Sequence, residues 1–372
     1  MTERLFDENS YLTAFEATVT ACRKTENGYA VILDRTAFFP EGGGQKGDEG
    51  FLNALPVHDT QETSDGEIEH YIDAPLAVGE RVSGRIDGEV RFARMQNHTA
   101  EHIFSGHVFR AFGLKNVGFH LGDGYMTVDY DGALTKSDIC LIEQMTMKTV
   151  FAALPVKAWF PQHPEAYEYR SKKELTGRIR LVEIPGVDLC ACCAPHLRTT
   201  AEVGCVKVLS CERYKGGVRL TMTAGAWAMR EFTMAWDTVM HLSALFSLPP
   251  QEVAHGADQL AQKLKESEDA LKQARREDVL RLVRESTEPF VFVPDASFLP
   301  LAADVLYARF GGAVAAFSGA EETGYRYMLL FSDPQIKDRA LTLWHASGGG
   351  KPGTLQGMAH AKRAELMALW ET

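Results

Sequence analysis

Two short motifs, about ninety residues apart, constrain the fold of this chain more than any other feature. The first is HTAEH, from His98 to His102, and the second is CCAPH, from Cys192 to His196. On a helix, residues four positions apart lie on one face with Cβ atoms about 5–6 Å apart, so a pair of side chains at this spacing can hold one ion. Each motif alone supplies too few ligands for a metal centre. A metal site would therefore require a fold that brings both motifs together.

The ligand types indicate which metal such a site would bind. Imidazole and thiolate groups together favour Zn²⁺ over hard cations, so we predict a zinc site with His98, His102, Cys192 and His196 as ligands. Glu101 precedes the second histidine, whereas the glutamate of the metallopeptidase motif HExxH follows the first. We therefore disfavour a zinc peptidase and expect Glu101 to be a solvated helix residue.

Cysteine usage and charge narrow the class of protein. The chain has seven cysteines, five of them between residues 190 and 211, and its first residues, MTERL, lack the apolar core of a signal peptide. An odd cysteine count in this context indicates reduced thiols or metal ligands, and we expect a cytoplasmic protein without a membrane span. The net charge of −11 argues against a nucleic-acid coat protein, but it leaves room for local basic patches.

Local patterns predict an α+β fold. Residues 16–22 and 29–33 are short β-branched segments separated by turn residues. Residues 91–112 have helical character without proline, 137–153 form an amphipathic pattern, and 117–130 read as a hairpin around Gly-Asp-Gly. The early part of the chain is thus rich in β structure, and the next part mixes helices and strands.

These patterns divide the 372 residues into four regions. We expect a β-rich, barrel-like subdomain with a glycine-rich loop at 1–90, an α/β zinc-binding domain at 91–230, a helical linker at 231–287, and a small α/β domain at 288–372. In the linker, apolar residues recur at alternating steps of four and three from Val253 to Ala274. This narrow seam is compatible with a coiled hairpin, a dimer contact or a surface helix packed on its own domain.

Four segments make the chain similar to a known family: 36–45 (TAFFPEGGGQ), 97–102 (NHTAEH), 192–204 with its Cys-x-x-x-His, and 219–225 (RLTMTAG). In order and spacing they resemble the free-standing alanyl-tRNA editing proteins of the AlaX type, relatives of the editing domain of alanyl-tRNA synthetase. The end of the chain, with GGGKP and QG after residue 347, resembles the DHH-associated domain of alanyl-tRNA synthetases. Together the two resemblances imply the long form of the family.

One departure from the family pattern lies beside a predicted ligand. The family usually has Gly-Thr before the last histidine, whereas this chain has Ala194-Pro195 before His196. Proline fixes φ near −65° and lacks an N–H donor. We therefore expect the turn that presents His196 to differ from that of the family.

The resemblance implies a zinc-dependent hydrolase that acts in trans on tRNA(Ala) charged with serine or, as a second candidate, glycine. It implies that Thr36 recognises the seryl hydroxyl. The amide of Gln45, at the end of the glycine-rich loop, is a candidate donor to the ester or ribose. Gly43 and Gly44 would let the backbone approach the terminal adenosine or the oxyanion. A homodimer through the helical linker or the last domain is a further expectation.

Basic clusters are the candidate contacts to tRNA, and we expect them at Lys172, Lys173, Arg178, Arg180, Arg213, Lys215, Arg219, Lys272, Arg275, Arg276, Lys351, Lys362 and Arg363. Two alternatives to this function stay open. Threonyl-tRNA synthetase carries a related editing domain, so the substrate could be Ser-tRNA(Thr). The zinc site could also stabilise a tRNA-binding module without catalysis.

Overall fold

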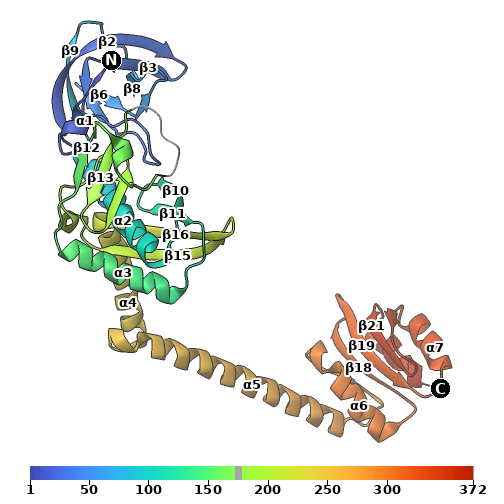
Figure 1. Ribbon diagram of the computed structural model, residues 1–372. Helices are drawn as coiled ribbons and strands as arrows, with labels where there is room; N and C mark the ends of the chain where they lie inside the picture. Colours follow the sequence, from blue (N-terminus) through green and yellow to red (C-terminus); the bar gives the residue numbers. More distant parts are fainter. Residues whose placement is uncertain (172–177, 372) are drawn as a thin grey trace. The chain divides into compact units, whose positions relative to one another are not determined.

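The computed structural model describes residues 1–171 and 178–371 (Figure 1). The chain has the expected mixed α+β fold and divides into two compact units, Met1–Met240 and His241–Thr372. The finer division into four regions stays a prediction. In the described part of the chain, no helix combines the length and the apolar character that crossing a bilayer demands.

A strongly curved sheet of seven strands forms the first part of unit 1. Its strands, in the order β6-β5-β9-β2-β3-β8-β7, are β6 (Leu55–Val57), β5 (Gly50–Leu52), β9 (Arg81–Ile86), β2 (Ala14–Thr25), β3 (Gly28–Leu33), β8 (Ile68–Ile72) and β7 (Asp59–Glu62). Exposed and buried residues alternate along β9, as in an antiparallel strand with one face on a core. Because β6 also contacts β8, the sheet is nearly closed, in agreement with the expected barrel-like shape.

A separate two-stranded sheet and a short helix adjoin these strands in the chain. Strand β1 (Glu3–Arg4) pairs in parallel with β4 (Arg35–Thr36), and a single helical turn, α1 (Leu5–Glu8), follows β1. The segment after β4 is the glycine-rich loop, which leaves the sheet toward the centre of unit 1.

The long helix α2 (Gly88–Phe112) forms the centre of unit 1. The carboxylate of Asp87 accepts hydrogen bonds from the N–H groups of Glu89 and Val90 and caps its start. Gly113, with φ 70°, ends it in the left-handed conformation typical of a helix terminus. Between residues 91 and 108 every side chain of α2 except that of Phe92 is buried.

Two further sheets and a helix surround α2. The four-stranded antiparallel sheet consists of β10 (Asn116–Leu121), β11 (Met126–Tyr130), β16 (Gly217–Ala224) and β15 (Val206–Tyr214). The three-stranded sheet consists of β12 (Lys157–Trp159), β13 (Leu181–Ile184) and β14 (Asp188–Ala191). The hairpin predicted at 117–130 is β10–β11, and the predicted amphipathic helix is α3 (Lys136–Phe151). Short 3₁₀ turns lie at Pro164–Ala166 and Thr200–Val203.

Unit 2 is built on a five-stranded sheet in the order β17-β18-β19-β21-β20. Helix α4 (Gly225–Phe246) begins in unit 1 and ends in unit 2, and α5 (Val253–Glu285) follows it. Trp344 and Phe317 lie in the core of this sheet. The remaining elements are β17 (Phe290–Phe292), α6 (Leu299–Phe310), β18 (Ala313–Ala320), β19 (Gly324–Phe331), α7 (Gln335–Leu343), β20 (Ser347–Gly349), β21 (Thr354–Ala359) and α8 (Arg363–Met367).

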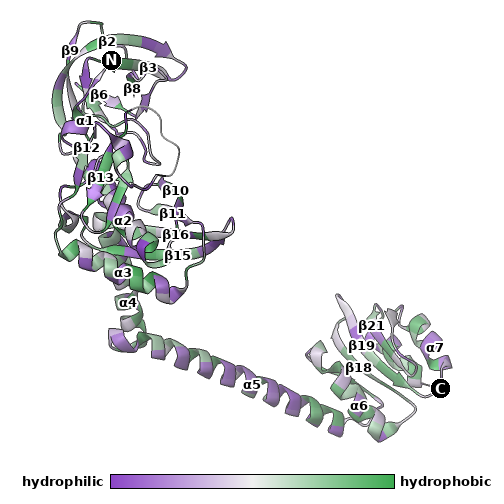
Figure 2. Cartoon of the chain, in the orientation of Figure 1, coloured by the Kyte–Doolittle hydropathy of each residue, from purple (hydrophilic) through white to green (hydrophobic). Residues whose placement is uncertain are grey.

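Helix α5 is the predicted long helix with a narrow apolar seam. Figure 2 shows that most of it is hydrophilic. Its last turns pack on α6 through Val279 and Val283, whereas Leu260, Leu264 and Leu271 are 56%, 59% and 53% exposed. Val279 and Val283 lie beyond the seam, which ends at Ala274, so their packing does not cover the seam and a dimer contact along it stays a prediction.

Candidate metal centre

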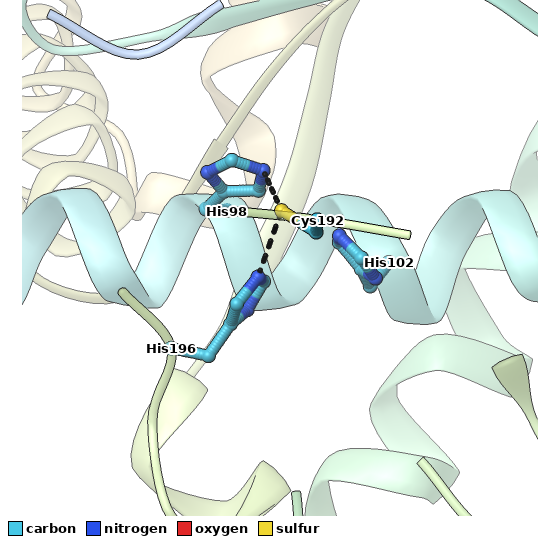
Figure 3. Close-up of side chains that lie close together, drawn as sticks. All are labelled: His98, His102, Cys192 and His196. Carbon is cyan, nitrogen blue, oxygen red and sulfur yellow. Dashed lines mark hydrogen bonds between the residues drawn. The ribbon is translucent and has the colours of Figure 1, made fainter. Parts of the chain in front are cut away.

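The four predicted metal ligands lie together beside α2 (Figure 3). The ligand atoms of His98, His102, Cys192 and His196 are all within 4.8 Å of one another. The sulfur of Cys192 lies 3.5 Å from Nε2 of His98 and 3.4 Å from Nε2 of His196. The two motifs, one on a helix and one just after strand β14, therefore converge on a single point.

A glycine allows the helix and the strand to approach so closely. Gly106 lies one helical turn after His102, and a Cβ at this position would be only 2.6 Å from the carbonyl oxygen of Val187. Strand β14 begins at the next residue, Asp188, and leads directly to Cys192. The close contact at Gly106 thus determines how far the cysteine lies from the two histidines.

Two of the imidazoles are oriented by hydrogen bonds at Nδ1. Nδ1 of His98 lies 3.0 Å from Oε1 of Gln45, so it donates to the amide oxygen and leaves the lone pair of Nε2 directed at Cys192. Nδ1 of His196 lies 3.1 Å from the hydroxyl of Thr99. Polar partners of this kind fix the tautomer and the ring orientation of metal-binding histidines. Gln45 is therefore placed as a support for His98.

The third imidazole is held by a buried carboxylate that the sequence did not indicate. Nδ1 of His102 lies 3.1 Å from Oδ2 of Asp188. Arg170 binds the same carboxylate with two hydrogen bonds, of 2.6 and 2.8 Å. Arg170 and Asp188 are eighteen residues apart and show no spacing that would have marked them as a pair.

The electrostatics of the cluster favour a bound cation. Burial opposes ionisation of Cys192, but His98 and His196 outweigh it and hold the pKa of the thiol well below its usual range. Burial also lowers the pKa of His102, but Asp188, Cys192 and Glu101 outweigh this effect and raise it to about 9. Several anionic groups thus surround one point inside the protein, where a dication would neutralise them.

The expectation that Glu101 is a solvated residue is wrong. Glu101 is 1% exposed, and its carboxylate accepts hydrogen bonds from the hydroxyl of Ser105, at 2.7 Å, and from the amide of Asn116. Ser105 in turn lies 2.8 Å from the hydroxyl of Tyr130. Because α2 is buried on almost every side, a charged residue between the histidines reaches other protein groups rather than solvent.

The glycine-rich loop borders the same site. Gly43 and Gly44 have φ of 62° and 84°, and a Cβ on Gly44 would lie 2.4 Å from the carbonyl oxygen of Phe119. Both glycines, together with His98, His102 and Cys192, line a cavity of about 580 Å³. The structure thus places Gly43, Gly44 and three of the four candidate ligands around one space, while His196 and Gln45 are buried and do not line it.

Comparisons with known proteins connect this geometry with tRNA synthetases. The family model described as tRNA synthetases class II (A) matches residues 8–90, and the one described as Threonyl and Alanyl tRNA synthetase second additional domain matches residues 179–221. The alanine–tRNA ligase of Halorubrum lacusprofundi is 31% identical over 280 residues, which are 71% of this chain and 30% of the ligase. The chain spans about a third of the length of the ligases that it matches.

Shorter relatives decide the family. The alanyl-tRNA editing protein AlaX-M of Saccharolobus solfataricus is 34% identical over 238 residues, which are 60% of this chain and 99% of that protein. This chain belongs to the alanyl-tRNA editing protein family. The editing protein Aarsd1 of Rattus norvegicus is 26% identical in a match that covers 98% of this chain and 96% of the relative. The resemblance to the alanyl-tRNA editing proteins is thereby confirmed, whereas the DHH-associated character of the last domain stays a prediction.

Thr36 lies apart from this cavity. It is fully buried, and its hydroxyl donates to Nε2 of His70, at 2.8 Å, while it accepts from the N–H of Phe38, at 3.1 Å. Nδ1 of His70 in turn donates to the carbonyl of Val31. The structure therefore does not bring Thr36 to the candidate ligands, and its role as the reader of the seryl hydroxyl in this editing protein stays a prediction.

The turn that departs from the editing-family pattern is held by an arginine. The guanidinium of Arg180 donates to the carbonyl oxygens of Cys192, at 3.2 Å, and Ala194, at 2.8 Å. These bonds involve carbonyl acceptors, so the missing N–H of Pro195 does not affect them. His196 reaches the cluster despite the altered sequence.

The structure shows the burial and the partners of several basic residues that were expected to contact tRNA. Arg180 is buried, binds the turn and also lines the cavity, so its contact with phosphate stays a prediction. Arg219 makes a bidentate pair with Asp129 and stacks on Tyr214. Lys172 and Lys173 lie outside the described residues.

Proposed function

We propose that this chain hydrolyses the ester bond of mischarged tRNA(Ala), with Ser-tRNA(Ala) as the first substrate and Gly-tRNA(Ala) as the second. The observation that carries the proposal is the convergence of His98, His102, Cys192 and His196, three of which line a cavity, in a chain of the alanyl-tRNA editing family. Three relatives that are not ligases are named as alanyl-tRNA editing proteins, which supports deacylation in trans.

Zinc is the cofactor that the donor set fits. Three imidazoles and one thiolate suit Zn²⁺, and their mutual distances allow all four atoms to reach one ion. When bound, zinc would supply Lewis acidity toward an ester carbonyl or a water molecule. The residues of the chain hold the imidazoles in place, and Gly43 and Gly44 keep the adjoining cavity free of side chains, so that an ester can approach the backbone.

Deacylation of purified Ser-tRNA(Ala) by the zinc-loaded protein tests the proposal. We expect hydrolysis by the wild type and its loss in His98→Ala and His102→Ala. The matched control is His120→Ala, which alters an exposed histidine on β10 and should retain the wild-type rate. Unchanged hydrolysis in the two ligand variants would contradict the assignment.

A panel of substrates separates the alternatives. Preferential hydrolysis of Ser-tRNA(Thr) would assign the threonine identity instead. Binding of tRNA without hydrolysis of any mischarged species would favour a zinc-stabilised binding module. Zinc content, measured by elemental analysis of each preparation, should be about one ion per chain.

A further inference from the structure

Two buried arginines of α2 bind the segment that contains the glycine-rich loop. This segment, residues 37–49 between β4 and β5, is called the β4–β5 segment below. Ordering it costs conformational entropy, which contacts with the rest of the protein must offset. Arg91 and Arg94 are 1% and 2% exposed, and at their spacing from His98 all three side chains lie on one face of α2. The face of α2 that carries two candidate ligands therefore also carries the groups that bind this segment.

Arg91 connects the two ends of the β4–β5 segment. Its guanidinium donates to the carbonyl oxygen of Ala37, at 2.7 Å, and to both carboxylate oxygens of Asp48. The same carboxylate accepts a hydrogen bond from the N–H of Phe39, at 2.6 Å. Asp48 is 1% exposed, so the two charges lie out of water and each needs the other as a partner. One buried ion pair thus holds the start and the end of the segment together on α2.

Arg94 binds the segment nearer to the candidate metal centre. Its guanidinium donates to the carbonyl oxygen of Gly47, at 2.8 Å, and lies 3.8 Å from the carboxylate of Asp48. Gly47 follows Gln45 by two residues, and the amide oxygen of Gln45 accepts from Nδ1 of His98, at 3.0 Å. The contacts of α2 with the segment therefore follow one another along the helix, and the last of them reaches a candidate ligand.

Strand β10 binds the same segment on its other side. The N–H of Leu121 donates to the carbonyl oxygen of Gly44, at 2.7 Å. The segment thus lies between β10 and α2. The two arginines determine its position on the helix side, which is the side where Gln45 meets His98.

We propose that Asp48, Arg91 and Arg94 are positioning residues that hold the β4–β5 segment against α2 and thereby keep Gln45 at Nδ1 of His98. None of the three lines the cavity beside the metal centre, so they act through Gln45 rather than on a substrate. The inference deepens the proposed function, on which it rests for the purpose of the site, because it concerns the support of the same metal centre.

A double-mutant cycle in zinc affinity tests this role in the full-length protein. Arg94→Met keeps the length of the side chain and removes its donors, and Gln45→Leu removes the amide that binds His98. We expect each substitution alone to weaken zinc binding roughly tenfold, as does the loss of a partner of a metal-binding histidine. The double variant should bind zinc as Gln45→Leu does, because the effect of the arginine requires the glutamine. Competition with a chromophoric chelator measures the affinities.

Hydrogen exchange reports on the segment itself, without reference to activity. The backbone N–H groups of residues 42–45 should exchange at least tenfold faster in Arg94→Met, because a segment with fewer contacts opens more often. Arg94→Lys keeps a cationic donor and should recover most of the zinc affinity and slow the exchange again. The matched control is Arg23→Met, which breaks the ion pair with Glu69 between β2 and β8 and should leave both quantities at their wild-type values.

Thermal unfolding of each variant verifies that it is folded, and Arg94→Gln, with a shorter neutral donor, serves in the same cycle if Arg94→Met does not fold. Wild-type zinc affinity and wild-type exchange in the folded Arg94 variant would overturn the proposal. Multiplied effects of the two substitutions would overturn it as well, because the arginine would then act independently of Gln45. Coupled effects on zinc affinity, without hydrolysis of any mischarged tRNA, would support the positioning role and reject the deacylase function.

Discussion

The carboxylate of Asp188 contacts two side chains, those of His102 and Arg170, that no sequence pattern links to it. One oxygen of its carboxylate lies near His102, and both oxygens bind Arg170. The arginine keeps the buried carboxylate ionised, because an opposite charge favours the anion. The carboxylate in turn holds the imidazole in the orientation that a metal requires. Asp188 is therefore expected to contribute to metal binding without being a ligand.

Replacing Asp188 with Asn keeps the shape of the side chain and removes its charge. We expect Asp188→Asn to lower zinc affinity by roughly 10- to 100-fold, as is typical when a partner of a metal-binding histidine is lost. Competition with a chromophoric chelator measures this change. The control is Asp129→Asn, which breaks the bidentate pair with Arg219 on β11 and β16. Equal zinc affinity in the two variants would contradict the role given to Asp188.

A buried histidine gives a second prediction at this scale. Burial lowers the pKa of His70 to about 4, whereas an unfolded chain takes up this proton near pH 6.5. The unfolded state therefore binds more protons between these values, and the free energy of unfolding should fall by about 3 kcal/mol as the pH drops from 6.5 to 4. Denaturant titrations at several pH values measure the slope. A His70→Gln variant with the same slope would exclude His70 as its source.

At the level of single residues, the sequence predicted those site residues that a regular spacing or a resemblance to a known family marks. Four-residue spacing marked His98, His102, Cys192 and His196, and these side chains do converge. A lone aspartate such as Asp188 carries no periodic signal, because its partners come from distant segments. The position of Thr36 depends on its bonds to His70 and the backbone, which no local pattern reveals.

At the level of elements, the contact between α2 and β14 positions the site. Gly106 is buried in this contact, where a side chain would meet the backbone of Val187 and the Cβ of Asp188. Glycine is unfavourable inside a helix by about 1 kcal/mol relative to alanine. Only a residue without a Cβ fits at this position, and the close approach of the strand brings Cys192 near the histidines.

Adding one methyl group at Gly106 should separate the helix and the strand. We expect Gly106→Ala to lower the free energy of unfolding by about 1–3 kcal/mol through overpacking, and to weaken zinc binding as well. Chemical denaturation and chelator competition measure the two effects. Gly88→Ala, at the start of the same helix, adds a Cβ 3.2 Å from the methyl group of Thr13 and should be neutral or slightly stabilising. A Gly106→Ala protein as stable as Gly88→Ala would show that the contact is not tight.

The hydrophobic periodicity of the sequence predicted where helices and strands lie better than it predicted which of their residues are buried. The pattern located the helix of residues 91–112 to within three residues and identified the hairpin β10–β11. It failed at Glu101, because amphipathic reasoning assumes that a helix has a solvated face. Helix α2 lacks one over most of its length, since sheets and α3 surround it.

At the level of the whole molecule, the division at Met240 separates the candidate metal centre from unit 2. All four candidate ligands and the cavity lined by Gly43 and Gly44 belong to unit 1. AlaX-M of Saccharolobus solfataricus matches 60% of this chain over 99% of its own length, so a family member exists with little beyond the equivalent of one unit. The basic clusters of unit 2 are expected to add tRNA contacts.

A chain ending after Phe246, at the end of α4, tests this division of roles. We expect it to keep about one zinc ion and most of the turnover on saturating Ser-tRNA(Ala). Its tRNA affinity should fall at least tenfold, because a second linked contact raises overall affinity by such factors. Filter binding and single-turnover assays measure the two quantities. Full tRNA affinity together with loss of turnover would reverse the assignment of roles.

Because α2 is buried on almost every side, we expect few of its positions to tolerate substitution. From residue 91 to 108 nearly every position touches other protein groups. An ordinary amphipathic helix tolerates random replacements along its wet side, so that a saturation mutagenesis profile rises and falls every three or four positions. For α2 the profile should be an unbroken stretch of intolerance, with tolerated changes confined to the two ends.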